Sequence, residues 1–115
     1  IKAAEQKYPD KKLITVFEPH TFSRTKEFAS EIAQILNTSD ASFVKDIYSA
    51  REKQEDFEGV NSNLIIDKLK NGHHINDDEA SKLFGYKDCV IIFMSPKQMS
   101  KLENDVIEYF KNNWF

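Results

Sequence analysis

The stretch Leu13-Ile14-Thr15-Val16-Phe17 is a short run of apolar and β-branched residues, which is typical of a strand buried on both faces of a sheet. Glu18-Pro19-His20-Thr21 ends this run, and a helical spacing begins at Ser23. The apolar stripe of that helix consists of Phe28, Ala29, Ile32, Ala33, Ile35 and Leu36. A buried strand that leads directly into an amphipathic helix indicates a βαβ crossover and therefore a parallel sheet.

The rest of the chain repeats this alternation. Strands are predicted over 41–48, 73–75 and 89–94, and helices over 1–8, over 61–70, over 76–84 (opened by a capping box at 76–79) and from Ser95 onward. The residues of the last helix that we expect to face inward are Met99, Leu102, Val106 and Phe110. We therefore predict an α/β fold, a Rossmann-like three-layer sandwich with a mostly parallel sheet flanked by helices, in one domain over residues 1–115.

The composition of the 115 residues excludes several classes of protein. The 16 Lys and Arg against 19 Asp and Glu give a net charge of −3, which supplies no general attraction for nucleic acid. A single cysteine excludes an internal disulfide framework and a multi-cysteine zinc site. No apolar run approaches the ~20 residues of a membrane span, and the first residues do not resemble a signal peptide. We expect a cytoplasmic domain that contacts neither nucleic acid nor membrane.

Phosphate and metal sites are not predicted either. Gly59, Gly72 and Gly85 each stand alone, and none precedes Lys-Ser or Lys-Thr, so the chain has no phosphate-binding loop for ATP. His73 and His74 are adjacent in a predicted strand and would point to opposite faces, so both rings cannot easily bind one ion. Cys89 begins an apolar run without basic neighbours, and we expect it to be a buried core thiol.

Ligands of open parallel sheets bind outside the carboxyl ends of the strands, which selects the turns over 18–24, 46–52 and 95–98. Arg24 lies in the first turn of a helix, beside free backbone N–H groups, where a guanidinium makes a reasonable carboxylate receptor. His20 can donate or accept a proton near neutral pH. Each residue also has a simpler interpretation: a solvated arginine, a structural histidine, and in Asp46 a helix cap or a partner of Arg51.

The first of these turns carries a recognisable motif. The stretch 16–25, Val-Phe-Glu-Pro-His-Thr-Phe-Ser-Arg-Thr, resembles the F-Q-P-H-x-Y-[ST]-R-T signature in the C-terminal domain of the Mur ligases of peptidoglycan synthesis. The stretches 46–52 and 59–62 are similar to that family's D-[IV]-Y-x-A-R-E and G-V-[ST]-S, and residues 1–3 resemble the end of its D-D-Y-x-H-H-P-T-E-I-K-A segment. The similarity runs in the right order over nearly the whole chain.

Three positions depart from the family pattern. Glu18 stands in place of the usual Gln, and Phe22 in place of the usual Tyr, which removes a hydroxyl from the turn. Ser95-Pro96-Lys97-Gln98 stands where the family has a G-A-G-D turn, so a close approach of that backbone to a ligand is not expected here.

The resemblance implies a three-domain ligase of which residues 1–115 form the C-terminal, amino-acid-presenting domain. By resemblance, one domain of the enzyme binds UDP-N-acetylmuramate, a central domain holds ATP and Mg²⁺, and the C-terminal domain presents L-alanine for attack on an acyl phosphate. No cofactor is then expected on this fragment alone, no catalytic residue is assigned to it, and the isolated fragment is expected to be inactive. The substrate-binding residues implied are His20, Thr21, Ser23 and Arg24, and the neighbouring cleft residues are Asp46, Tyr48, Arg51 and Ser95.

Two alternatives remain open from the sequence. One is the related ligase that attaches a recycled tripeptide to the same sugar. The other is a free-standing α/β signalling or binding module, such as a phospho-receiver with Asp46 as the acceptor at a strand end, although the first strand lacks the acidic pair that would hold magnesium.

Overall fold

The computed structural model describes residues 6–86, 88–95 and 100–112. Its sheet has four strands, β1 (Lys12–Phe17), β2 (Ala41–Val44), β3 (Gly72–His74) and β4 (Cys89–Met94). The strands are all parallel and lie in the order β3-β2-β1-β4, so β1 is central and β4 forms one edge. The sheet confirms the predicted α/β fold with a parallel sheet.

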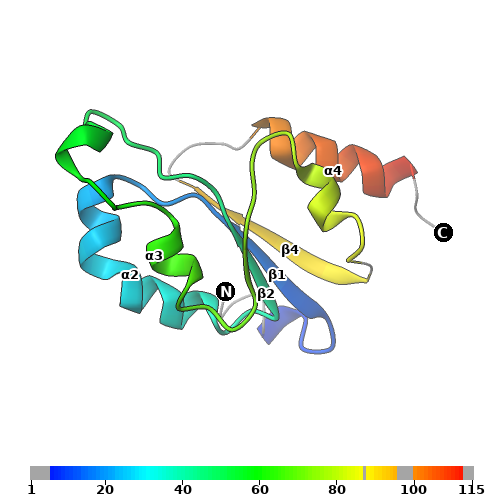
Figure 1. Ribbon diagram of the computed structural model, residues 1–115. Helices are drawn as coiled ribbons and strands as arrows, with labels where there is room; N and C mark the ends of the chain where they lie inside the picture. The colour runs from blue at the N-terminus through cyan, green and yellow to red at the C-terminus, as the bar shows by residue number, and fades with distance from the viewer. Residues whose placement is uncertain (1–5, 87, 96–99, 113–115) are drawn as a thin grey trace.

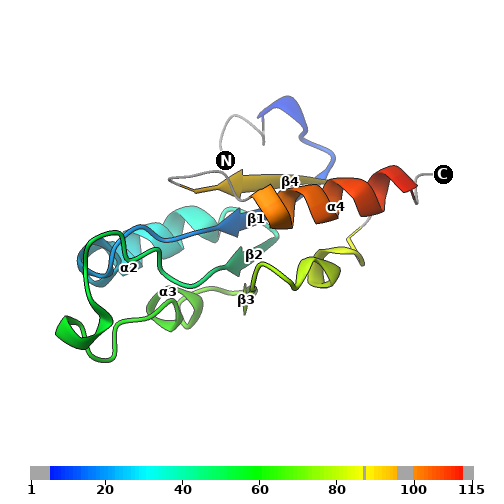
Figure 2. The ribbon, with the colours of Figure 1, turned by 90° about the horizontal axis from the view of Figure 1, so that it is seen from above.

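Helices cover both faces of this sheet and make three layers (Figures 1 and 2). Helices α2 (Phe22–Leu36) and α3 (Asn63–Ile66) pack together on one face. Helix α4 (Ser100–Asn112) and the 3₁₀ turn η2 (Ala80–Leu83) lie on the other face, and a second 3₁₀ turn, η1 (Gln54–Asp56), lies in the long connection after β2. None of the helices in the described part of the chain is long and apolar enough to cross a membrane.

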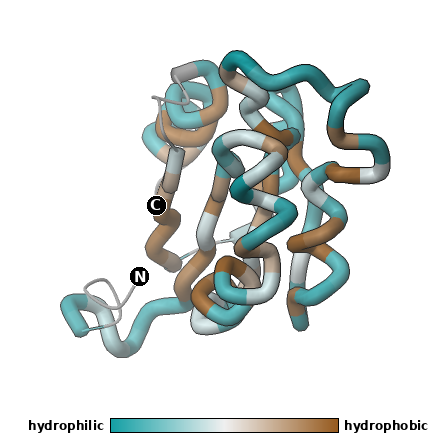
Figure 3. Tube along the Cα trace, turned by 90° about the vertical axis from the view of Figure 1, so that its left-hand side faces the viewer, coloured by the Kyte–Doolittle hydropathy of each residue, from teal (hydrophilic) through white to brown (hydrophobic). Residues whose placement is uncertain are grey.

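Side chains along β1 and β2 point alternately to the two faces of the sheet, so each face has its own hydrophobic core. Ile14 and Val16 pack with Phe43 against Leu102 of α4 and Leu83 of η2. On the opposite face a second cluster consists of Ala29, Leu36, Val44 and Ile65. In Figure 3 the hydrophobic stretches lie along the strands, and the hydrophilic stretches lie in the outer loops. Each fully buried Leu, Ile or Val contributes about 1.5–3 kcal/mol relative to an exposed position.

Helix α2 buries a narrower stripe than its sequence predicts. Ala29, Ala33 and Leu36 are buried, but Phe28 is 45% exposed and Ile35 is 54% exposed. Each of these two exposed residues lies one position before a buried one, which rotates its side chain about 100° away from the sheet. The predicted inward positions of Phe28 and Ile35 are therefore wrong.

Several predicted elements are shorter in the structure. The strand predicted over 41–48 ends at Val44, because the following backbone turns toward the loop after β1. The helix predicted over 61–70 is one regular turn followed by turns, and the helix predicted over 76–84 is a 3₁₀ turn over Ala80–Leu83. Of the helix predicted over 1–8, the described part is helical at residues 6 and 7. The turn over 96–98, Met99, Trp114 and Phe115 lie outside the described residues.

Candidate functional site

The turn between β1 and α2 has a strained backbone that neighbouring groups hold in place. Thr21 has a positive φ of 65°, an unfavourable conformation for a β-branched residue that costs about 1–3 kcal/mol. Its hydroxyl accepts a hydrogen bond from the Arg24 N–H at 3.3 Å, and its carbonyl accepts the Thr25 hydroxyl at 2.8 Å. Thr21 is therefore the N-cap of α2. Because strained backbone conformations cluster at functional sites, this turn is a candidate site.

The loop after β2 joins this turn directly. The Tyr48 N–H donates to the Pro19 carbonyl, and the Thr21 N–H donates to the Tyr48 carbonyl, each at 2.8 Å. The rings of His20 and Tyr48 are stacked, with centroids 5.8 Å apart and planes inclined by 17°. The structure thus brings together His20, Thr21 and Tyr48, which the sequence assigned to two separate turns.

Glu52 closes the start of α2 from the same loop. Its Oε1 accepts the N–H groups of Phe22 at 2.6 Å and Ser23 at 3.1 Å, and its Oε2 accepts the Ser23 hydroxyl at 2.6 Å. The Ser23 hydroxyl, and then the two backbone N–H groups and the nearby charge of His20, lower the pKa of the Glu52 carboxyl, against the opposing effect of desolvation. The N–H groups expected to be free beside Arg24 are therefore already bonded.

The side chains of the two arginines of the predicted site take no part in these Glu52 contacts. Arg24 and Arg51 are exposed, and neither guanidinium has a hydrogen bond or an ion pair among the described residues. Asp46, the expected partner of Arg51, instead hydrogen-bonds the Nε2 of His74 at 2.8 Å. Arg24 therefore remains available to an external anion next to a fixed turn.

A cluster of charged side chains, two of them buried, lies at the carboxyl ends of the strands. Glu18 accepts hydrogen bonds from the Lys45 ammonium at 3.0 Å and from the Ser95 hydroxyl at 2.8 Å. Lys45 also pairs with Asp77 at 2.5 Å, and the Lys45 and Glu18 side chains are only 10% and 6% exposed. Since these residues follow β1, β2, β3 and β4, the cluster ties together the carboxyl ends of all four strands.

The protonation of Lys45 reflects this pairing. Burial alone would lower the pKa of the Lys45 ammonium, but the hydrogen bonds and charges of Asp77 and Glu18 outweigh it and raise the pKa above its usual value. Neither Lys45 nor Glu52 was singled out from the sequence. Both lie in or beside the 46–52 motif, but their partners are 27 to 32 residues away, and no local spacing reveals such contacts.

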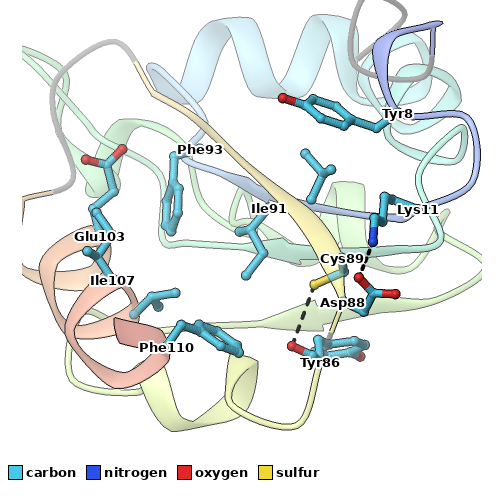
Figure 4. Close-up of a pocket in the computed structure, with 12 residues that line it drawn as sticks. Tyr8, Lys11, Tyr86, Asp88, Cys89, Ile91, Phe93, Glu103, Ile107 and Phe110 are labelled. Atoms are coloured by element: carbon cyan, nitrogen blue, oxygen red, sulfur yellow. Dashed lines mark hydrogen bonds and ion pairs between the residues drawn. The ribbon is translucent and has the colours of Figure 1, made fainter. Parts of the chain in front are cut away.

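A cavity in the described part of the chain lies elsewhere, along the outer edge of β4 (Figure 4). It measures about 740 Å³ and is lined mainly by apolar side chains, among them Ile91, Phe93 and Ile107. None of the residues predicted for the substrate site lines it. Its mainly apolar lining is unsuited to recognising a small charged amino acid.

Cys89 borders this cavity and is half-buried, rather than fully buried as expected. Burial, with a smaller effect of Asp88, raises the pKa of the Cys89 thiol, so the protonated form dominates at neutral pH. We expect iodoacetamide to alkylate native Cys89 several-fold more slowly than the unfolded chain at pH 7.5, measured by mass spectrometry. Equal rates in the native and unfolded chains would contradict this protonation state.

Among the residues that the structure describes, no group of three or more His, Cys, Asp and Glu side chains could hold a metal ion. His73 and His74 do diverge: His73 stacks on Phe43 with centroids 5.0 Å apart, and His74 pairs with Asp46. At this edge of the sheet the structure places the stacked His20 and Tyr48 rings next to the first turn of α2, which carries the exposed Arg24.

Sequence comparison finds close relatives with one common name. The chain is 42% identical over 104 residues to the UDP-N-acetylmuramate–L-alanine ligase of Lactobacillus delbrueckii subsp. bulgaricus, 43% identical over 105 residues to that of Lactiplantibacillus plantarum, and 38% identical over 105 residues to that of Lactobacillus johnsonii. Each match covers 90% of the chain but 23% of the relative, in the C-terminal portion. The chain thus spans about a quarter of the length of these relatives, and no family model matches it.

Proposed function

The chain is homologous to the C-terminal portion of the UDP-N-acetylmuramate–L-alanine ligases, and we propose that it is the domain that presents the amino acid in such a ligase. Residues 1–115 would form the last of three domains, the others binding the UDP-sugar and ATP with Mg²⁺. The observation that carries the proposal is Arg24, an exposed cation with no partner among the described residues, which follows the hydrogen-bonded turn at Thr21 within the first family motif. The reaction would belong to peptidoglycan synthesis in a bacterial cytoplasm.

The chain's own contribution would be binding and orientation. ATP and Mg²⁺, held by the rest of the enzyme, would convert the sugar carboxylate into an acyl phosphate. Arg24 would pair with the alanine carboxylate, as a guanidinium does through charge-assisted hydrogen bonds, and leave the amine free to attack. His20, held by its stack on Tyr48, would line the same pocket, with Thr21 and Ser23 forming the adjoining turn. Positioning of this kind can lower a barrier by several kcal/mol.

The test is a ligation assay on the full-length protein expressed from its natural reading frame. We expect phosphate release that requires ATP, UDP-N-acetylmuramate and L-alanine together, and no ligation by residues 1–115 alone. A tripeptide acceptor should support at least tenfold lower kcat/KM than L-alanine, because the relatives are named for alanine. Preference for the tripeptide would move the assignment to a recycling ligase, and no ATP-dependent ligation with either acceptor would overturn it.

A further inference from the structure

The Glu52 carboxylate joins the two loops of the candidate site, and neither the implied site residues nor the proposed mechanism includes it. Glu52 lies at the end of the loop after β2, whereas its three hydrogen-bond donors lie on Phe22 and Ser23, 29 to 30 residues earlier in the chain. The first turn of α2 therefore has a second capping side chain, besides Thr21, that comes from a different loop. Arg24 is the next residue of that turn.

The Glu52 contacts act on the part of α2 that needs support. The first N–H groups of a helix have no partner within it, and the partial positive charge there favours a carboxylate over a cation. Arg24 in the first turn is disfavoured by the same field, and the Glu52 carboxylate, bonded to the N–H groups of the two preceding residues, offsets that effect. Lys26 is a further cation on this end of α2, and His20 lies close enough to Glu52 to interact with its charge.

Glu52 also completes the connection between the two loops. The His20–Tyr48 stack and the backbone bonds of Tyr48 hold His20 and Thr21, the N-cap of α2. Glu52 supplies the contact to Phe22 and Ser23. The start of the helix is therefore bonded to the loop after β2, on whose Tyr48 the His20 ring stacks.

We propose that Glu52 is a positioning residue, which caps α2 from the second loop and thereby holds Arg24 at a fixed place relative to His20 and Tyr48. This inference rests on the proposed function, in which Arg24 binds the alanine carboxylate. Because the N–H groups of Phe22 and Ser23 are bonded to Glu52, they are not shared with the ligand, and Arg24 provides the charge for the carboxylate. Loss of the cap would let the first turn of α2 fray and move Arg24.

The experiment compares Glu52→Ala and Glu52→Gln in the full-length protein by steady-state kinetics. Glu52→Ala is expected to raise the KM for L-alanine about tenfold or more, with the KM for ATP within about twofold, because misplacement of a binding group weakens the binding of its own ligand. Glu52→Gln keeps an oxygen that can accept both N–H groups, so it should restore the L-alanine KM to within about threefold. If Glu52→Ala does not fold, Glu52→Asp, which is one methylene shorter, takes its place with the same expectation.

Glu58 provides the matched control, since it is exposed on the same connection and has no hydrogen bond or ion pair among the described residues. Glu58→Ala and Glu58→Gln should leave the L-alanine KM unchanged. A folded Glu52→Ala enzyme with lower thermal stability but an unchanged L-alanine KM would mean a structural role only and would overturn the proposal. Absence of ligation by the wild type would instead overturn the proposed function, and the positioning role with it.

The capping contact itself can be measured without activity. In the wild-type chain, the backbone N–H signals of Phe22 and Ser23 should shift on acidification with an apparent pKa below the usual range of a glutamate, and Glu52→Gln should abolish that shift. The lowered pKa means that the cap stabilises the fold above the unfolded pKa and is lost as the pH falls through the folded pKa. Signals of Phe22 and Ser23 that do not respond to Glu52 would also overturn the proposal.

Discussion

Lys45→Met is expected to destabilise the domain by about 3–4 kcal/mol at pH 7, a large share of the stability of a small domain. The substitution keeps the length and much of the packing of the side chain but leaves the Glu18 carboxylate buried, with the Ser95 hydroxyl as its remaining described partner outside the backbone. An uncompensated buried charge carries the full penalty of its desolvation. The measurement is the free energy of unfolding in urea, with the slope of the transition compared between variants.

Two variants separate this effect from a general loss of charge. Lys101→Met removes an exposed pair with Asp105 at i, i+4 and should leave the free energy of unfolding nearly unchanged, because solvent screens such a pair. Glu18→Gln combined with Lys45→Met removes both buried charges, and its stability should return to within about 1 kcal/mol of the wild type. A single Lys45→Met variant as stable as Lys101→Met would show that the Glu18–Lys45 pair does not determine the stability of this edge.

The stabilisation that the Glu18–Lys45 pair gives to the fold is expected to be lost at alkaline pH. Because the pKa of Lys45 is raised in the folded state, the pair stabilises the fold fully below the unfolded pKa of lysine and is lost as the pH rises through the folded pKa. The loss therefore falls in the alkaline range, above pH ~10. Lys45→Met should lack this part of the pH dependence.

Arg24→Ala is expected to lower kcat/KM for L-alanine about 100-fold in the full-length protein, which corresponds to about 3 kcal/mol. The reason is that Arg24 is the proposed partner of the substrate carboxylate, and its loss leaves that carboxylate without its charged partner. The thermal midpoint should stay unchanged, because the Arg24 guanidinium is exposed and has no partner among the described residues. Initial rates across L-alanine concentrations at saturating ATP and UDP-sugar make the measurement.

Lys26→Ala is the matched control for Arg24, since Lys26 is an exposed cation two residues further along α2 without a described hydrogen bond or ion pair. Its kcat/KM should remain within about twofold of the wild type. Arg24→Lys should recover only part of the loss, because an ammonium cannot reproduce the two-point contact of a guanidinium with a carboxylate. Equal effects of Arg24→Ala and Lys26→Ala would indicate only a general electrostatic attraction.

The fold was predictable because its decisive signals are local. The apolar runs of β1 and β4 and the periodicity of α2 each lie within one element, and parallel pairing follows from the alternation of strands and helices. The bounds were less predictable where tertiary contacts end an element. The backbone after Val44 leaves the strand because Tyr48 pairs with the residues on either side of His20, which no property of 41–48 indicates.

The residues of the candidate site were predictable in type but not in arrangement. The position of three turns at one edge of the sheet follows from parallel topology, and the structure brings His20 and Tyr48 together there. The roles of Glu52 and Lys45 depend on partners far away in the sequence, so neither was foreseen. Glu18 departs from the family motif, and nothing in the sequence explains it. In the structure it accepts hydrogen bonds from Lys45 and Ser95, which also lie far away in the sequence.

The central claim, that Arg24 binds the carboxylate of the incoming amino acid, is tested most directly by comparing L-alanine with L-alaninamide, which lacks that carboxylate. The measured quantity is the ratio of kcat/KM for the two acceptors in the wild type and in Arg24→Ala. The account predicts a wild-type preference of about 100-fold for L-alanine that falls to within about threefold in the variant, because only the charged contact distinguishes the acceptors. A preference that survives intact in Arg24→Ala would contradict the account.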